Sequence, residues 1–233
     1  MKTITITSVP GYNEWRIASR ECLAQSIPPE NIIWQSSESI QDDLFGDGEQ
    51  DIAASKPKTQ HTIPKSVLIL FKYALCHQDA SRFALCYRVL WRVIFENKNL
   101  IQLKTDQDIL QLTTLAKAVK RDAYKISAFL RFREVTLDGQ EHFIAWYEPE
   151  HFSLEIKLDF FQTRFKNMRW SILTPYRAAH WDTEKLVLED NPDPRVFPDE
   201  DRIEKYWLTY YANIFNPARI KKSAMLSSMP KKY

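Results

Sequence analysis

The spacing of hydrophobic positions along the chain changes its character near residue 128. Up to that point, three segments between residues 62 and 127 carry apolar side chains at helical spacing: "IPKSVLILFKYALCH", "DASRFALCYRVLWRVIF" and "TDQDILQLTTLAKAVKRDAYKISAF". The second segment is apolar almost all round, which predicts the most buried helix. In the third segment, Thr105 is a possible N-cap and Asp108 follows three residues later, close to a capping box. These residues therefore predict a helical N-terminal half.

Beyond residue 128 the apolar positions alternate, which is typical of strands. "FLRFREV" and "HFIAWYE" flank Asp138-Gly139, a strong hairpin signal, and "FSLEIKL", "MRWSILTP", "RAAHW" and "LVLE" predict further strands. "DFFQTRF" predicts a short helix, and "DEDRIEKYWLTYYANIF" a last amphipathic helix. We therefore expect an α+β fold, with a helical N-terminal half packed on an antiparallel sheet of four or more strands and with a C-terminal helix.

Composition shifts suggest where domains begin and end. Residues 1–35 alternate in "TITIT", are helical in "YNEWRIASRECLAQ" and alternate again in "NIIW", which predicts a small β-α-β element. Residues 36–61 form an acidic and polar linker with little to build a core. We expect the α+β core domain to span residues 62–215 and a basic C-terminal segment to span residues 216–233.

Length and composition indicate a folded cytoplasmic protein. The 233 residues, 44% of them hydrophobic, are enough to bury one sizeable core. No apolar run approaches the roughly 18 to 20 residues that span a bilayer, and the N-terminus has no apolar stretch typical of a signal peptide. The three cysteines have irregular spacing, which argues against a disulfide framework and favours a reducing cytoplasm. We expect no membrane partner.

Charge is segregated along the chain, although the net charge is only +2. Residues 117–133 carry six basic side chains against Asp122 alone, and the C-terminal segment is basic as well. Basic regions with aromatic residues nearby fit a nucleic-acid footprint, whereas a charge run by itself more often marks a solvated helix face. The six candidates for phosphate contacts are Lys117, Lys120, Arg121, Lys125, Arg131 and Arg133.

Residues 170–182, "WSILTPYRAAHWD", gather the side chains closest to a site. Aromatic rings can stack on bases, arginine can hold phosphate, and a histidine beside a carboxylate can transfer protons. The candidates for base contacts are Trp170, Tyr176, Arg177 and Trp181, and those for catalysis are His180, Asp182 and Arg177. A His-Asp pair without a nucleophile is nonspecific, so for catalysis the residues themselves favour a plain structural role.

Sequence motifs for bound cofactors are absent. The chain has no G-x-G-x-x-G, no Walker A loop, no H-E-x-x-H and no paired C-x-x-C. We therefore expect no cofactor and no metal.

Five segments carry a resemblance to a known family: "FALCYRVLWR", "LAKAVKRDAYKISAFLRFREV", "FIAWYEPEHF", "FFQTRFKNMRWSILTPYRAAHWD" and "YWLTYYANIFNPARIKKSAMLSSMPKKY". They resemble an uncharacterised bacterial family whose members are labelled probable DNA metabolism proteins and share a domain of unknown function. The resemblance covers residues 64–233, and more loosely "EWRIASRECLAQSIPPENIIW". Some members are paired with a DNA repair protein of the radical SAM class. Others continue past "MPKKYW" into a uracil-DNA glycosylase-like domain of the UdgX type.

The resemblance implies DNA as a partner without implying a reaction. One hypothesis is a DNA-binding accessory module in bacterial DNA repair or modification, acting with the glycosylase-like domain or the radical SAM protein. The alternative is an enzyme that acts on DNA or a modified base through His180, Asp182 and Arg177. A protein-interaction scaffold is a third hypothesis.

A short motif lies in the acidic linker. Gln41-Asp42-Asp43-Leu44-Phe45 has the form Q-x-x-L-F, which resembles peptides that bind the bacterial sliding clamp. A linker can offer such a peptide to an apolar pocket while few residues become ordered. We expect Gln41, Leu44 and Phe45 to bind a partner; the alternatives are that Leu44 and Phe45 fold back on the chain's own surface, or that the match is chance.

Overall fold

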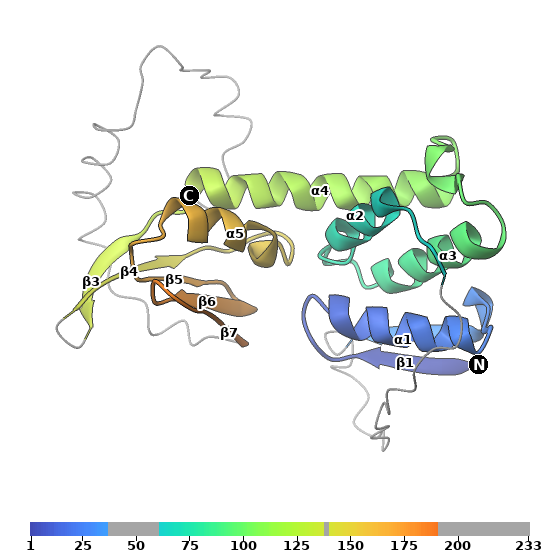
Figure 1. Cartoon of the computed structure of the whole chain (residues 1–233), viewed down its shortest axis with the longest axis horizontal. Helices are drawn as coiled ribbons and strands as arrows, with labels where there is room; N and C mark the ends of the chain where they lie inside the picture. Colours follow the sequence, from blue (N-terminus) through green and yellow to red (C-terminus); the bar gives the residue numbers. More distant parts are fainter. Residues whose placement is uncertain (37–60, 138–139, 191–233) are drawn as a thin grey trace, which may run out of the picture. The chain divides into compact units, whose positions relative to one another are not determined.

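The structure is a computed structural model that describes residues 1–36, 61–137 and 140–190 (Figure 1). Its contacts divide the chain into two compact units, Met1–Lys120 and Arg121–Tyr233. The linker and the C-terminal helix expected from the sequence lie outside the described residues. The expected domain boundaries stay predictions.

The first unit begins with a strand, a helix and a strand. Strand β1 (Lys2–Ile6) pairs in parallel with β2 (Ile32–Ser36), and helix α1 (Tyr12–Ala24) lies between them in sequence. A short 3-10 turn, η1 (Pro29–Asn31), leads into β2. The helix buries the residues that its spacing predicts, namely Trp15, Ala18, Cys22 and Leu23.

Three helices complete the first unit: α2 (Lys65–Ala74), α3 (Arg82–Phe95) and the first part of α4 (Gln107–Phe129), with a 3-10 turn, η3 (Leu100–Gln102), before α4. Helix α3 has the largest share of buried residues among the described helices, eight of 14, as its apolar pattern predicts. Two hydrogen bonds fix it to the preceding segment: Trp15 Nε1 donates to the Phe83 carbonyl at 3.0 Å, and Tyr87 Oη donates to the Ile27 carbonyl at 2.7 Å.

Helix α4 is capped by Asp106, so the expectation that Thr105 is the N-cap is wrong. Oδ1 of Asp106 accepts hydrogen bonds from the backbone N–H of Asp108 at 3.1 Å and of Ile109 at 3.2 Å. These are two of the N–H groups that the first turn of a helix leaves without an intrahelical acceptor. An aspartate accepts them with a charged oxygen, which also suits the positive end of the helix dipole.

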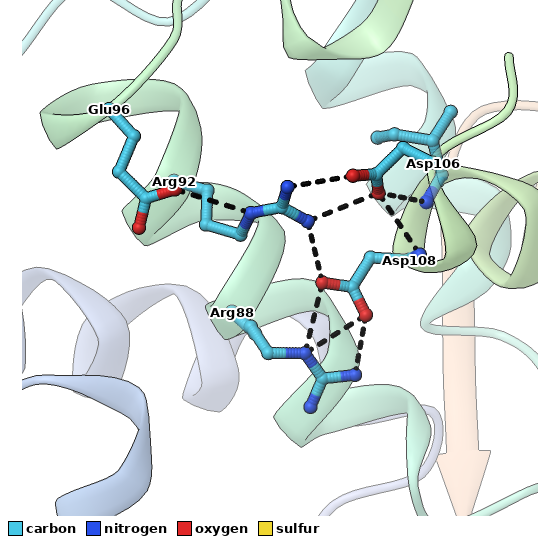
Figure 2. A network of polar contacts seen from close by, with 6 residues as sticks. Arg88, Arg92, Glu96, Asp106 and Asp108 are labelled. Atoms are coloured by element: carbon cyan, nitrogen blue, oxygen red, sulfur yellow. Dashed lines mark hydrogen bonds and ion pairs between the residues drawn. The ribbon is translucent and has the colours of Figure 1, made fainter. Parts of the chain in front are cut away.

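An ion-pair network connects α3 to the start of α4 (Figure 2). Arg88 makes a two-pronged contact with Asp108, its Nη2 lying 2.8 Å from Oδ1, and Arg92 reaches both Asp106 at 2.7 Å and Asp108 at 2.8 Å. The hydrogen bond from Arg92 is the main reason that the pKa of Asp106 lies below its usual value. Because these charges satisfy one another, the network holds two helices together and leaves no carboxylate poised for chemistry.

The second unit is built on a five-stranded sheet in the order β3-β4-β5-β6-β7 (Figure 1). The strands are β3 (Arg133–Leu137), β4 (Gln140–Trp146), β5 (Trp170–Leu173), β6 (Arg177–Trp181) and β7 (Leu186–Asp190). The expected α+β fold with four or more strands is confirmed. The sheet is mixed, however, because β4 and β5 run parallel while the other neighbours are antiparallel.

The parallel pair follows from α5 (Leu154–Arg164), which lies in the connection between β4 and β5. "FSLEIKL" was expected to be a strand, and this prediction is wrong, because most of that segment forms the start of α5. Leu154 and Leu158 fit an alternating pattern, but with Phe161 they also fit positions i, i+4 and i+7 of a helix, and all three are buried. They pack in one core cluster with sheet residues such as Trp170.

None of the described helices is both long enough and apolar enough to cross a membrane.

Candidate functional site

The three catalytic candidates point in different directions. Successive side chains of a strand alternate between its two faces, so Arg177 and His180 lie on opposite faces of β6. Arg177 faces α5, where its Nη1 donates to Oε1 of Glu155 at 2.9 Å, and its Nη2 lies 2.6 Å from Oδ1 of Asp190. Its guanidinium is therefore occupied by two carboxylates.

Asp182 belongs to the turn between β6 and β7. Its Oδ1 accepts the backbone N–H groups of Glu184 at 2.8 Å and Lys185 at 2.6 Å. The bond from Lys185, followed by that from Glu184, lowers the pKa of Asp182. The structure does not bring Asp182, His180 and Arg177 together as one polar site.

His180 instead belongs to a polar chain that crosses four adjacent strands. Oγ of Ser171 on β5 lies 2.7 Å from Nε2 of His142 on β4 and 2.7 Å from Nδ1 of His180 on β6. Nε2 of His180 lies 3.2 Å from Oε2 of Glu189 on β7. The registers place these side chains on the face opposite α5, since Ser171 is directly opposite His180.

The donor and the acceptor of each hydrogen bond in this polar chain follow from Glu189 at its exposed end. An ionised Glu189 can only accept, so a neutral His180 donates from Nε2 and accepts the Ser171 hydroxyl proton at Nδ1. Ser171 can then accept from Nε2 of His142. Desolvation is the main cause that lowers the pKa of His142, and the neighbouring His180 lowers it further, which favours the neutral ring. Sequence reasoning found His180 but missed Ser171 and His142, because only strand pairing brings them together.

The aromatic candidates lie in the interior. Trp170 is fully buried, and the buried Trp181 donates its Nε1 hydrogen to the Lys166 carbonyl at 3.1 Å. Tyr176 is half-buried; its hydroxyl donates to Oε2 of Glu155 at 3.1 Å. These three rings contribute to the core beneath α5 and do not form an exposed stacking surface.

The six basic candidates divide into two groups. Arg133 is only 4% exposed, and Arg131 donates from Nη1 to the carbonyls of Ala128 and Leu130 at the end of α4. Lys125 is paired with Glu150 at 2.8 Å. The remaining three, Lys117, Lys120 and Arg121, are exposed on α4, and none forms an ion pair within the part of the chain that the structure describes.

These three cations share one face of α4 with Tyr124. Each residue turns an α-helix by about 100°, so Lys117, Lys120, Arg121 and Tyr124 fall within an arc of about 100°. All four are exposed, and we call this face the α4 stripe. The ammonium of Lys120 also lies 4.6 Å from the centre of the Tyr73 ring, a cation–π contact. Tyr124 was not among the residues predicted from the sequence, although its helical spacing from Lys117 and Arg121 could have indicated it.

The one acid of this basic segment is turned away from the α4 stripe. Asp122 is buried, and its carboxylate accepts the backbone N–H groups of Glu150 at 3.1 Å and His151 at 3.0 Å and the hydroxyl of Ser153 at 2.6 Å. Three donors on one carboxylate compensate for its burial. Asp122 thus anchors the helix from its inner face and does not neutralise the exposed cations.

No group of three or more His, Cys, Asp or Glu side chains in the described residues could hold a metal ion. The three cysteines are buried, and none of them forms a disulfide within the described residues. The candidate clamp-binding residues Gln41, Leu44 and Phe45 lie outside the described residues.

Comparison with known proteins gives one match. A family model described as a domain of unknown function, DUF4130, matches residues 80–233, which is more than half of the chain. No curated protein and no solved structure matches significantly. The domain of unknown function implied by the sequence resemblance is thus found, and the label of DNA metabolism stays a prediction.

Proposed function

The chain belongs to the DUF4130 family of domains of unknown function, and on that premise we propose that it is a DNA-binding accessory module. The observation that carries the proposal is the α4 stripe, where Lys117, Lys120 and Arg121 are exposed along one helix face. Cations arranged in this way can neutralise successive phosphates, and such contacts are independent of base sequence.

Two features of the structure support a binding role for the α4 stripe. Asp122 is buried under three hydrogen bonds, so the stripe keeps its positive charge. Arg131, which donates to a backbone carbonyl, and Arg133, which is buried, are not part of the α4 stripe. The alternative is that the basic face of α4 is only solvated. In that case, removing its cations would not change DNA binding or its dependence on salt.

We further propose that the module works in bacterial DNA repair or modification beside a catalytic partner. The partner would be a uracil-DNA glycosylase-like domain or a radical SAM protein, as the sequence resemblance implies. The sliding clamp is a second proposed partner, through Gln41, Leu44 and Phe45. Loss of binding to purified clamp in a Leu44→Ala/Phe45→Ala variant would support that contact, and full retention would refute it.

A salt titration tests the DNA proposal. Binding of the full chain to fluorescent single-stranded and duplex DNA is measured by anisotropy between low and moderate salt. In Lys117→Ala/Lys120→Ala/Arg121→Ala, the slope of log affinity against log salt should become shallower by about 2 to 3 units, because three phosphate contacts are lost.

The matched control removes three exposed cations that lie outside the α4 stripe, in Arg16→Ala/Arg20→Ala/Lys98→Ala. This control should keep the wild-type slope. An equal loss of salt slope in both variants would show that the total positive charge matters and not its position on the α4 stripe. DNA binding that the first variant leaves unchanged would refute the proposal.

The polar chain through Ser171 favours a second candidate, an enzyme. A serine hydroxyl that donates to a histidine held by a glutamate has the polarity of an activated nucleophile. Such a serine should react with a fluorophosphonate probe, and the labelled peptide should contain Ser171 and disappear in His180→Ala. A chain that the probe leaves unlabelled would refute this candidate.

A further inference from the structure

Tyr124 is the most exposed aromatic side chain among the described residues. The residue is 62% exposed, against 47% for Phe95 and 43% for Phe160. Most large apolar side chains of the two units are in their cores, and the other aromatic candidates, Trp170 and Trp181, are buried. Tyr124 is therefore the ring that a ligand of the α4 stripe can reach.

The position of Tyr124 on α4 matches the cations around it. Arg121 and Lys120 precede it by three and four residues, which places them one turn away on the same face. Lys117 lies a further turn back, so Lys117 and Tyr124 are separated by about 10 Å along the helix axis.

Helical side chains lean toward the N-terminus of their helix. The three cations therefore extend away from Tyr124 along the α4 stripe and leave the ring at its C-terminal end. Lys125, the next residue, is held by Glu150 and does not compete for a ligand there. The stripe thus has a charged part and an aromatic end.

We infer that the α4 stripe binds single-stranded DNA, with Tyr124 stacking on an unpaired base while Lys117, Lys120 and Arg121 contact the adjoining phosphates. The inference rests on the proposed function and adds the class of ligand to it. In duplex DNA the faces of the bases are covered by their neighbours, so a ring on a helix surface has no base face to meet. In a single strand each base has an accessible face, and stacking tolerates any sequence.

Substitutions at Tyr124 test the inference without disturbing the core, because the ring is exposed. Affinities for a short single strand and for a duplex of the same sequence are measured with the full chain. Tyr124→Ala should weaken single-strand binding by about 5- to 150-fold, the range of one lost base stack, and should change duplex binding less than twofold. Tyr124→Phe should retain wild-type affinity, since the ring remains.

Phe160 supplies a matched control, because it is also an exposed aromatic residue beside a lysine. The ammonium of Lys157 lies 5.7 Å from the centre of the Phe160 ring. Phe160→Ala should leave single-strand affinity unchanged. Photocrosslinking to a strand that contains 5-iodouracil should give a covalent adduct at Tyr124. Equal weakening by both alanine variants, or an adduct at another site only, would overturn the inference.

The outcomes separate this inference from the proposed function. Salt-dependent binding that needs the three cations but is indifferent to Tyr124→Ala would overturn the stacking inference and leave DNA binding standing. Equal effects of Tyr124→Ala on the single strand and the duplex would overturn single-strand selectivity. Binding that ignores both the cations and salt would refute the proposed function and the inference with it.

Discussion

The ammonium of Lys125 lies 2.8 Å from Oε1 of Glu150, so the cation that follows Tyr124 in α4 is already paired within the fold. The hydrogen bond from Lys125 is the main cause that keeps the pKa of Glu150 below its usual range. Glu150 thus stays ionised near neutral pH beside the end of the α4 stripe. An acid in this position limits the positive charge that a polyanion meets.

We predict that Glu150→Gln strengthens DNA binding. The change frees Lys125 for one further phosphate contact, so affinity at low salt should rise severalfold and the salt slope should steepen by up to about 1 unit. Glu184→Gln is the control, because it removes the same charge from an exposed turn of the same unit. The prediction is wrong if Glu184→Gln strengthens binding as much.

Asp106 should show two separable contributions to stability. Asp106→Ala loses both the cap of α4 and the contact with Arg92, and should lower the free energy of unfolding by about 2 to 3 kcal/mol. Asp106→Asn keeps a capping oxygen and should cost about half as much. Denaturant unfolding measures both, and equal losses would show that the cap contributes nothing.

The same network predicts acid sensitivity. The hydrogen bond from Arg92 is the main cause that lowers the pKa of Asp106. Burial raises the pKa of Asp108, but the contacts with Arg88 and Arg92 together outweigh it, and the net pKa is lowered. An aspartate in an unfolded chain titrates near about 3.9, so this stability is fully present well above that pH and is lost as the pH falls through the lower folded pKa values. The free energy of unfolding is measured between about pH 6 and about pH 3, the range in which these aspartates titrate. It should fall less steeply with decreasing pH in Asp106→Asn than in the wild type. An unchanged pH profile would contradict the assignment.

His142 should add a separate loss of stability near neutral pH. Its pKa is lowered, first by desolvation and then by His180, so the folded state favours the neutral ring. An unfolded histidine titrates near about 6.5, so stability should decrease as the pH falls through that value toward the lower folded pKa. His142→Gln should flatten this part of the profile, and denaturant unfolding at a series of pH values measures it. The buried His151, whose pKa is also lowered mainly by desolvation, should act in the same direction.

The sequence predicted the elements better than it predicted the faces they present. The long apolar stripe of α4 is unambiguous, because many turns repeat the same spacing. The segment at Leu154 is ambiguous, because two leucines four residues apart satisfy both periods, and only packing against Trp170 decides for a helix. The parallel pairing of β4 and β5 has no local signal at all, since it depends on the path of the chain around α5.

For the candidate site, the basic run was visible but the exposure of its members was not. Arg133 counts as a cation in composition, yet its strand position buries it. Asp122 counts against the basic run in the sequence, but in the fold its carboxylate accepts three hydrogen bonds on the inner side of α4. Tyr124 was within reach of helical spacing alone, and the Ser171 chain was not, because its members come from four strands.

The parallel junction between β4 and β5 divides the sheet into two parts that differ in how they can form. The pairs β3-β4 and β5-β6-β7 join strands that are neighbours in sequence, so each can assemble from local contacts. The junction between them closes only after the intervening chain, with α5, has returned to the same edge, which costs loop entropy before any pairing is gained. Joining these two parts should therefore be a late event in folding, and contacts of α5 such as Leu158 should set its rate.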